Sequence, residues 1–423
     1  MRLPLPLILS VVSALAPVAT ITAADDAPDS RAARNQIVVS PQGPRDGGDF
    51  GPHTPGTKTS GLQEALLAAK RQAKDVYLAG GSWTHDETEP VVYHLHETLH
   101  VPWMQNFRLD SGHCVLNYTP STGDAVVFDS QMSCRYRLGL IVSQSDGAVV
   151  RMRPDTAGPD RFRVITSTEF TFNALVGGGG AWPGGEPHAN QLDQSRDWKG
   201  VGLWLDAEPG PIDGNKITVL ETVGCNIGLL LTGAATRNTI EETNIHLCRH
   251  HVQIGAAADA VPNDNRIEAF MDSQVLEPTT GARLFARRNL LVLSTRQTAT
   301  SSDLIFEPSA SGNIVMLHAP FRLTDRSSDH TNRVIAAGDA ALAIDMPAVP
   351  ASGESCQNTN PLPVEVRIVD PGSVDAWSEQ PAGQAWSEFR TGLTAGQSFV
   401  LNPGDRVKFD YREAPTWRWK AVR

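Results

Sequence analysis

Beyond its first two dozen residues, the sequence lacks any apolar run long enough to cross a bilayer, so we expect no membrane span. It also lacks an excess of basic residues, because 36 Lys and Arg stand against 47 Asp and Glu. Phosphate recognition requires a basic footprint, and the net charge of −11 therefore argues against a nucleic-acid partner. A local basic groove for another anionic polymer stays compatible with this charge.

Cysteines are few, and none forms a Cys-x-x-Cys pair, so the sequence predicts no metal site. In an exported protein five cysteines permit disulfides but leave one thiol over. The five are Cys114, Cys134, Cys225, Cys248 and Cys356.

Helical spacing of apolar residues is absent between Gly202 and Met316, where brief β-type runs are split by Gly, Asn, Asp or Thr. An asparagine opens each run, and the steps between these asparagines are 23, 27, 24 and 24 residues. A repeat of this length is typical of a solenoid. The asparagines are Asn215, Asn238, Asn265, Asn289 and Asn313.

A second marker keeps step with the asparagines: Gly202-Leu-Trp-Leu, Gly228-Leu-Leu-Leu and His251-Val-Gln-Ile occupy like places in successive units. Asn tolerates a left-handed backbone, so a recurring Asn predicts a recurring corner. Short strands that bury their faces only against neighbouring coils form a parallel β-helix. Cys225 and Cys248 then share an inward position on adjacent coils, where either a disulfide or a stacked pair of free thiols fits, and we favour the free pair.

These repeats resemble the right-handed parallel β-helix proteins of the pectate-lyase-like superfamily. Thr59-Ser-Gly-Leu-Gln-Glu-Ala-Leu-Leu-Ala-Ala-Lys followed by Asp75-Val-Tyr-Leu-Ala-Gly-Gly is similar to the entry segment of that group. The resemblance implies an all-β fold, with a right-handed parallel β-helix solenoid behind an N-terminal capping helix. The pattern places this helix at Ser60–Lys74, with Thr59 or Ser60 as its N-cap.

The rest of the chain divides by composition. Residues 1–24 read as a secretory signal peptide, which predicts a secreted or periplasmic protein, and residues 25–58 read as a leader. Residues 59–355 contain the parallel β-helix with its cap helix. From residue 356 to 423 apolar and polar residues alternate, which predicts a small antiparallel β module that caps the last coil.

A glycine-rich break from Val176 to Lys199 has no strand pattern and contains Trp182, His188 and Trp198. Loops of this length inside a fold are usually functional or disordered, and two tryptophans favour function. We therefore expect a flap over one face of the solenoid, with Trp182 and Trp198 as substrate-binding residues.

Candidate catalytic residues come from aligning the coils so that Leu203, Leu229, Val252 and Leu284 stack inward. Because neighbours along a strand alternate faces, three outward columns result. They are Gly202, Gly228, His251 and Arg283; Trp204, Leu230, Gln253 and Phe285; and Asp206, Thr232, Gly255 and Arg287.

Such a face suits an acidic sugar chain, since aromatic rings stack on sugars and Arg binds carboxylates in a bidentate manner. Cleavage by β-elimination needs a cation to neutralise the uronate and a base to take the neighbouring proton. We assign Arg283 or Arg287 to the first role and His251 to the second, with Arg249 nearby and Trp204 and Asp206 contacting substrate.

Two other functions stay open: a glycoside hydrolase and a non-catalytic glycan-binding or adhesion protein. Hydrolysis needs two carboxyl groups at a set separation, for which Asp206, Glu208, Glu241, Glu242, Glu268 and Asp272 are candidates. The motifs of the polygalacturonase-type hydrolases and the calcium-binding Asp cluster typical of pectate lyases are both missing. Whether calcium is needed, which polysaccharide is bound and whether the chain forms oligomers are therefore left undetermined.

Overall fold

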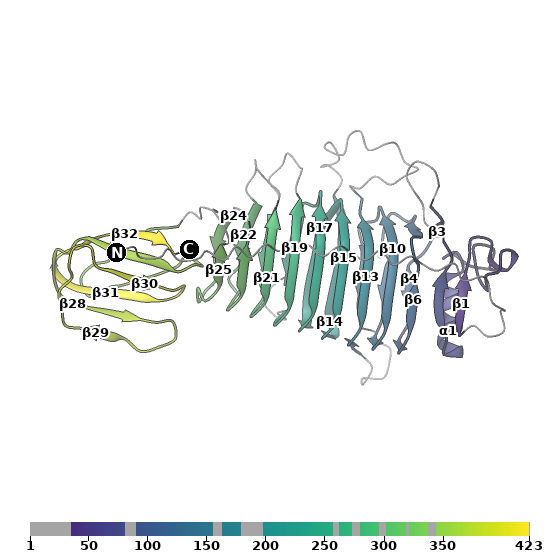
Figure 1. Cartoon of the computed structure of the whole chain (residues 1–423), viewed down its shortest axis with the longest axis horizontal. Coiled ribbons are helices and arrows are strands. Elements are labelled where there is room, and N and C mark those ends of the chain that lie inside the picture. Colours follow the sequence, from purple (N-terminus) through teal and green to yellow (C-terminus); the bar gives the residue numbers. More distant parts are fainter. Residues whose placement is uncertain are drawn as a thin grey trace, which may run out of the picture. The chain divides into compact units, whose positions relative to one another are not determined.

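The computed structural model describes residues 35–80, 90–154, 163–178, 198–256, 262–272, 280–295, 302–318, 321–336 and 344–422. The signal peptide, nearly all of residues 25–34 and Trp182 lie outside the described residues. Two large sheets contain most of the described strands, and every pairing between strands within these two sheets is parallel. The expected all-β parallel solenoid is thereby confirmed (Figure 1).

The first sheet has 13 strands, which alternate along the chain with those of the second. They are β1 (Gln36–Val39), β2 (Asp75–Leu78), β3 (Val92–Leu95), β6 (Arg108–Asp110), β7 (Val115–Tyr118), β10 (Arg135–Ser143), β13 (Glu169–Val176), β15 (Lys216–Val223), β17 (Thr239–His246), β19 (Arg266–Asp272), β21 (Leu290–Thr295), β23 (Ile314–Leu317) and β25 (Arg333–Ala336). Since β1 pairs with β2, this sheet includes a strand from the segment before residue 59.

The second sheet has 12 strands. They are β4 (Leu99–Val101), β5 (Met104–Gln105), β8 (Val126–Phe128), β9 (Gln131–Met132), β11 (Ala148–Met152), β12 (Ile165–Thr166), β14 (Lys199–Asp213), β16 (Cys225–Thr236), β18 (His250–Ile254), β20 (Thr280–Leu284), β22 (Ser302–Phe306) and β24 (Phe321–Asp325). The start of β14 pairs with β11 and its end with β12, so a central coil makes three rows of pairing.

The asparagines do mark the corners, but for a different reason from the one we expected. The left-handed residue is the one before each asparagine, for example Arg237 with φ 52° and Arg288 with φ 53°. The asparagines themselves are buried. Each side chain accepts from the backbone N–H of the previous asparagine and donates to a backbone carbonyl, as Asn238 does to Asn215 and Ile212. The corner therefore needs an amide for hydrogen bonding rather than for its backbone conformation.

The same side chains form a continuous ladder from coil to coil. Nδ2 of each asparagine donates to Oδ1 of the next, over 2.8 to 3.2 Å, through five successive steps. Asn332, which our repeat analysis did not include, ends the series. This asparagine ladder comprises Asn215, Asn238, Asn265, Asn289, Asn313 and Asn332.

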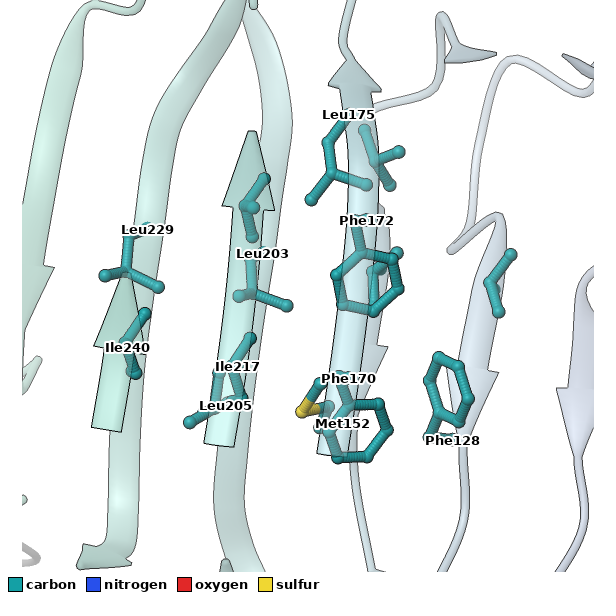
Figure 2. Packing of buried hydrophobic residues seen from close by; sticks show 14 of the residues in the cluster. Phe128, Met152, Phe170, Phe172, Leu175, Leu203, Leu205, Ile217, Leu229 and Ile240 are labelled. Atoms are coloured by element: carbon teal, nitrogen blue, oxygen red, sulfur yellow. The ribbon is translucent and has the colours of Figure 1, made fainter. Parts of the chain in front are cut away.

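Inward side chains stack into apolar columns because parallel strands in register place equivalent residues one above another. Tyr136 and Phe170 are stacked, with ring centroids 5.1 Å apart. Further along the axis aliphatic residues take over, and Figure 2 shows Leu203, Leu229 and Ile217 among them. All these side chains are fully buried, so the interior is one continuous core.

The one α-helix among the described residues, α1, runs from Leu62 to Gln72 and buries Leu62, Leu66 and its alanines. Its apolar face packs on the first coils, as the expected capping helix would. Gly61, with φ 85°, takes the N-cap position in place of Thr59 or Ser60. Thr59 still caps a backbone donor, because its hydroxyl accepts from Gln63 N–H at 3.0 Å. The described chain also has a 3₁₀ turn, η2, at Gly43–Arg45, and no helix long and apolar enough to span a membrane.

The C-terminal residues form the expected antiparallel module, with a core of its own. One sheet contains β26 (Ser355–Gln357), β28 (Ser373–Gln380), β29 (Ser387–Phe389) and β31 (Arg406–Glu413). The other contains β27 (Val364–Asp370), β30 (Ser398–Leu401) and β32 (Thr416–Ala421). Trp417 and Trp419 lie in this core, so neither presents an open ring to a sugar.

Candidate functional site

The outer face of the second sheet carries a column of polar and aromatic side chains over the inward Leu203, Leu229 and Val252. Register pairing joins Trp204 to Leu230 and Gln253 to Arg283. These outward residues are half-buried or nearly buried, whereas the three inward ones are fully buried. The outward position predicted for Trp204 is therefore correct. We call this surface the Trp204 face: Arg151, Trp204, Leu230, Gln253 and Arg283 with the flanking Asp206, Phe285 and Glu307.

Our alignment of the last coil was wrong by two residues. Val252 pairs with Ala282 rather than with Leu284, so Arg283 belongs to the column of Trp204 and not to that of His251. Arg287 instead bridges to Asn263 and Ser311, in the third row of pairing. Consequently Arg283 and Arg287 lie on different faces and do not form one cationic site.

The predicted outward position of His251 was also wrong. Its side chain is fully buried, with Nδ1 3.3 Å from the Thr280 carbonyl oxygen and Nε2 without a partner. Burial lowers the pKa of His251 to about 4. The glycines of the same column face inward as well, since a Cβ on Gly228 would lie 2.5 Å from Ile245 Cγ2. This column contributes to the corner packing and not to the outer surface.

At one end of the Trp204 face a guanidinium lies on an indole ring. Arg151 Cζ is 3.9 Å from the centroid of the Trp204 ring. The same guanidinium donates to Asp206 at 2.6 and 3.0 Å and to Asp124 at 3.0 Å. The Trp204 indole N–H donates to Thr232 at 3.0 Å. Trp204 and Asp206 are thus brought together as predicted, and Arg151, which sequence reasoning missed, fixes both.

A second cluster lies three strand pairings further along the same face. Arg283 Nε donates to Glu307 at 2.6 Å, and its guanidinium lies 5.1 Å from the Phe285 ring centroid. The Arg283 side chain is 41% exposed, so a ligand can reach it. Arg326 approaches Glu307 at 3.5 Å from the next coil. Glu307 therefore positions two arginines, a role that the sequence did not indicate.

His250 is the histidine that accompanies Arg283. It is half-buried, and burial together with the nearby Arg249 and Arg283 lowers its pKa. A lowered pKa keeps the imidazole neutral near pH 7 and able to accept a proton. The exposed Arg249 completes a group of one neutral base and two cations. Sequence reasoning came within one residue of this base, because His250 and His251 adjoin.

Trp198 lies apart from this group, at the edge where the first sheet leads into the second. Its indole N–H donates to the Leu247 carbonyl oxygen at 2.9 Å, two coils away. Beside Leu247, His246 Nδ1 is 3.6 Å from Glu221. Trp182, the other predicted flap residue, is outside the described residues.

The predicted carboxyl candidates do not form a hydrolytic pair within the described part of the Trp204 face. Asp206 is nearly buried and bonded to Arg151. Glu242 is buried inside the solenoid, and burial raises its pKa to about 8. Glu241 and Glu268 are register partners on the outer face of the first sheet.

No metal-binding group of three or more His, Cys, Asp or Glu side chains occurs in the described segments. All five cysteines are free and buried, as favoured for Cys225 and Cys248. No protein-family model, curated protein or solved structure gives a significant match to the chain, so the Trp204 face with His250 and Arg283 is a candidate site on geometric grounds.

Proposed function

We propose that the protein is an exported polysaccharide lyase that cleaves a uronate-containing glycan on the Trp204 face. The observation that carries this proposal is the neutral His250 beside the accessible, aromatic-flanked Arg283. Arg283 would neutralise the uronate carboxylate, which makes the proton on the neighbouring carbon more acidic. His250 replaces His251 as the base, because only the former is partly exposed.

The proposed step moves one proton and breaks one bond. His250 takes the proton from the carbon next to the carboxylate, and those electrons form a carbon–carbon double bond as the glycosidic C–O bond breaks. The departing oxygen takes a proton from solvent. Trp204, with Arg151 and Asp206 holding it, would stack on a sugar further along the chain.

Elimination is favoured over hydrolysis by the state of the carboxylates. Hydrolysis needs an acid and a base or nucleophile. On the described part of this face, Asp206 and Glu307 are nearly buried and bonded to arginines, which leaves neither available as a proton donor. A non-catalytic glycan-binding protein is the second candidate, since both clusters suit binding without requiring a chemical step.

Further parts of the proposal rest on the sequence. We place the chain in the pectate-lyase-like superfamily, with the right-handed coil that this implies. Residues 1–24 would be removed on export to the periplasm or medium, residues 25–58 would lead into a solenoid ending near residue 355, and residues 356–423 would cap it. N-terminal sequencing of the exported protein would test the cleavage position.

The deciding assay measures ultraviolet absorbance of unsaturated sugar ends beside new reducing ends. The mature protein is incubated with acidic and neutral polysaccharides, with and without calcium. We expect absorbance to rise on a polyuronate and to fall at least a hundredfold in His250→Gln and Arg283→Gln. The matched controls His100→Gln and Arg322→Gln carry the same changes on exposed residues of the second sheet and should retain activity.

Full activity in His250→Gln and Arg283→Gln would move the site elsewhere. Reducing ends without absorbance would identify a hydrolase. Binding of an intact polymer with no signal in either assay would favour the glycan-binding candidate.

A further inference from the structure

An open groove of about 670 Å³ lies away from the Trp204 face, over the corners where the second sheet leads into the first. Its floor is made by small residues that hold the left-handed corner position of four successive coils. These are Asn106, Ser133, Ser167 and Gly214, with φ between 52° and 67°. Their small side chains leave the space above the corners open.

The groove ends where this corner position changes to long side chains. Arg237 follows Gly214 in the series, with Arg288 two coils later, and both have the same left-handed backbone. Each lies over its own corner in an ion pair, Arg237 with Asp213 and Arg288 with Asp264. The groove is therefore a property of the N-terminal coils, set by the size of one residue in each.

One wall of the groove is a column of charged residues in register on the first sheet. Arg108 pairs with Arg135, Arg135 with Glu169, and Glu169 with Lys216. With strands about 4.8 Å apart, the first and last cation are about 14 Å apart. All three cations are exposed and line the groove, so the wall is basic although the protein is acidic.

Only part of this charge is neutralised. Arg135 Nε donates to Glu169 at 2.9 Å. Arg108 and Lys216 make no ion pair with any described residue, although Arg108 lies beside Arg135 in the sheet. Like charges side by side repel, so the arrangement costs stability unless an anion occupies the groove.

We propose that this groove binds a segment of an acidic polysaccharide, at a site separate from the Trp204 face. Arg108 and Lys216 would contact carboxylates about three strand spacings apart. Asn106, Ser133 and Ser167 supply the amide and hydroxyl groups that match sugar hydroxyls. Binding here requires neither the Trp204 face nor any cleavage there.

The groove fits a polyuronate better than a nucleic acid. Single-stranded nucleic acid binds through exposed aromatic platforms as well as cations. Phe107, the aromatic residue of this groove, is only 5% exposed and lies in the core. Two unpaired cations over about 14 Å also provide fewer charges than a phosphate backbone offers in that length.

The test measures affinity for polygalacturonate by calorimetry, with neutral dextran and a single-stranded oligonucleotide as comparison ligands. The double variant Arg108→Gln/Lys216→Gln should weaken polygalacturonate binding at least tenfold and reduce its dependence on salt. The control Arg266→Gln/Arg333→Gln removes the same charge from exposed positions in the same outward column, outside the groove, and should change Kd less than twofold. All variants are made in the His250→Gln background to prevent cleavage.

A second variant tests the space rather than the charge. Ser133→Gln places a long neutral side chain in the floor, which Arg237 and Arg288 show to be compatible with this backbone. We expect a similar loss of binding. Equal affinities for the groove and control doubles, or tighter binding of the oligonucleotide than of polygalacturonate, would overturn the proposal.

Discussion

Asn238 Nδ2 donates to Asn265 Oδ1 over 3.0 Å, and the backbone N–H of Asn238 donates to the same oxygen over 3.0 Å. One side-chain oxygen therefore satisfies two buried donors of the preceding coil. Asn265 Nδ2 in turn donates to the Ala235 carbonyl oxygen and to Asn289. Each asparagine in the middle of the ladder thus connects three consecutive coils.

Replacing Asn265 by Ala should lower the free energy of unfolding by about 3 kcal/mol, because buried donors and acceptors on both sides lose their partners. Asn265→Asp should cost a similar amount, since a carboxylate cannot donate to Ala235 and Asn289. Chemical denaturation measures both. Asn226→Ala is the control, as this half-buried asparagine has no side-chain hydrogen bond within the described chain. Equal costs at the two positions would argue against a stabilising ladder.

Glu242 should make stability decrease with pH. Its carboxyl is buried and accepts one bond, from Thr222 at 3.3 Å, while Oε1 has no partner. Burial raises its pKa from 4.5 to about 8, so between these values the folded state binds more protons than the unfolded state. The free energy of unfolding then falls as pH rises through this window, by about 1 kcal/mol between pH 7 and pH 8.5.

The measurement is denaturation of wild type and Glu242→Gln at pH 7 and pH 8.5. Glu242→Gln should remove this component of the slope. Both conditions lie above the range in which His251 contributes the opposite trend. Since burial lowers the pKa of His251 from 6.5 to about 4, its effect increases stability as pH rises only up to about 6.5. An unchanged slope in Glu242→Gln would exclude this carboxyl as the source.

Arg151 and Asp206 should be strongly coupled. Removing Arg151 leaves Asp206, which is 2% exposed, with only the 3.5 Å contact to Arg153. Arg151→Met should therefore cost about 3 kcal/mol. Adding Asp206→Asn should recover at least about 1 kcal/mol of the summed single costs.

A double-mutant cycle followed by urea denaturation measures this coupling. The exposed pair Arg412–Asp375 in the C-terminal module is the control, and Arg412→Met there should change stability by less than about 0.5 kcal/mol. Additive effects of the Arg151 and Asp206 substitutions would contradict the predicted coupling.

The thiols should be unreactive in the native protein. All five cysteines are buried, and burial raises the pKa of Cys114 to about 12 and that of Cys356 to about 11. Since the thiolate is the reactive species, a thiol reagent should label fewer than about one site before unfolding and all five in denaturant. Ser121→Cys, at an exposed position, provides a fast-reacting control. Fewer than five labelled sites in denaturant without reductant would reveal a disulfide.

The sequence was sufficient for the repeat and its corners because each corner needs the same buried amide. It was insufficient for the last coil. Ala282 and Leu284 are both apolar and two residues apart, so either satisfies the alternation of a strand, and a shift of two residues leaves the pattern intact. Only the pairing of Val252 with Ala282 decides between them, and this moved Arg283 beside Gln253.

The site depended on a second property that a period of two does not contain. His251 was assigned outward by counting from Val252, but counting fails near a corner, where the chain turns from one sheet to the next. Its neighbour His250 retains partial exposure and lies near Arg283. Arg151 could not be found from the repeat, because its partner Asp206 is 55 residues away.

The asparagine ladder gives the molecule an electrical direction. Every side-chain amide in it points its oxygen toward the N-terminal coils and donates toward the C-terminal ones, so the dipoles add rather than cancel. In this respect the column corresponds to the backbone of an α-helix, with Oδ1 of Asn215 as its negative end, directed at the Thr168 N–H. A solenoid built from uncharged corners is thereby polarised along its axis.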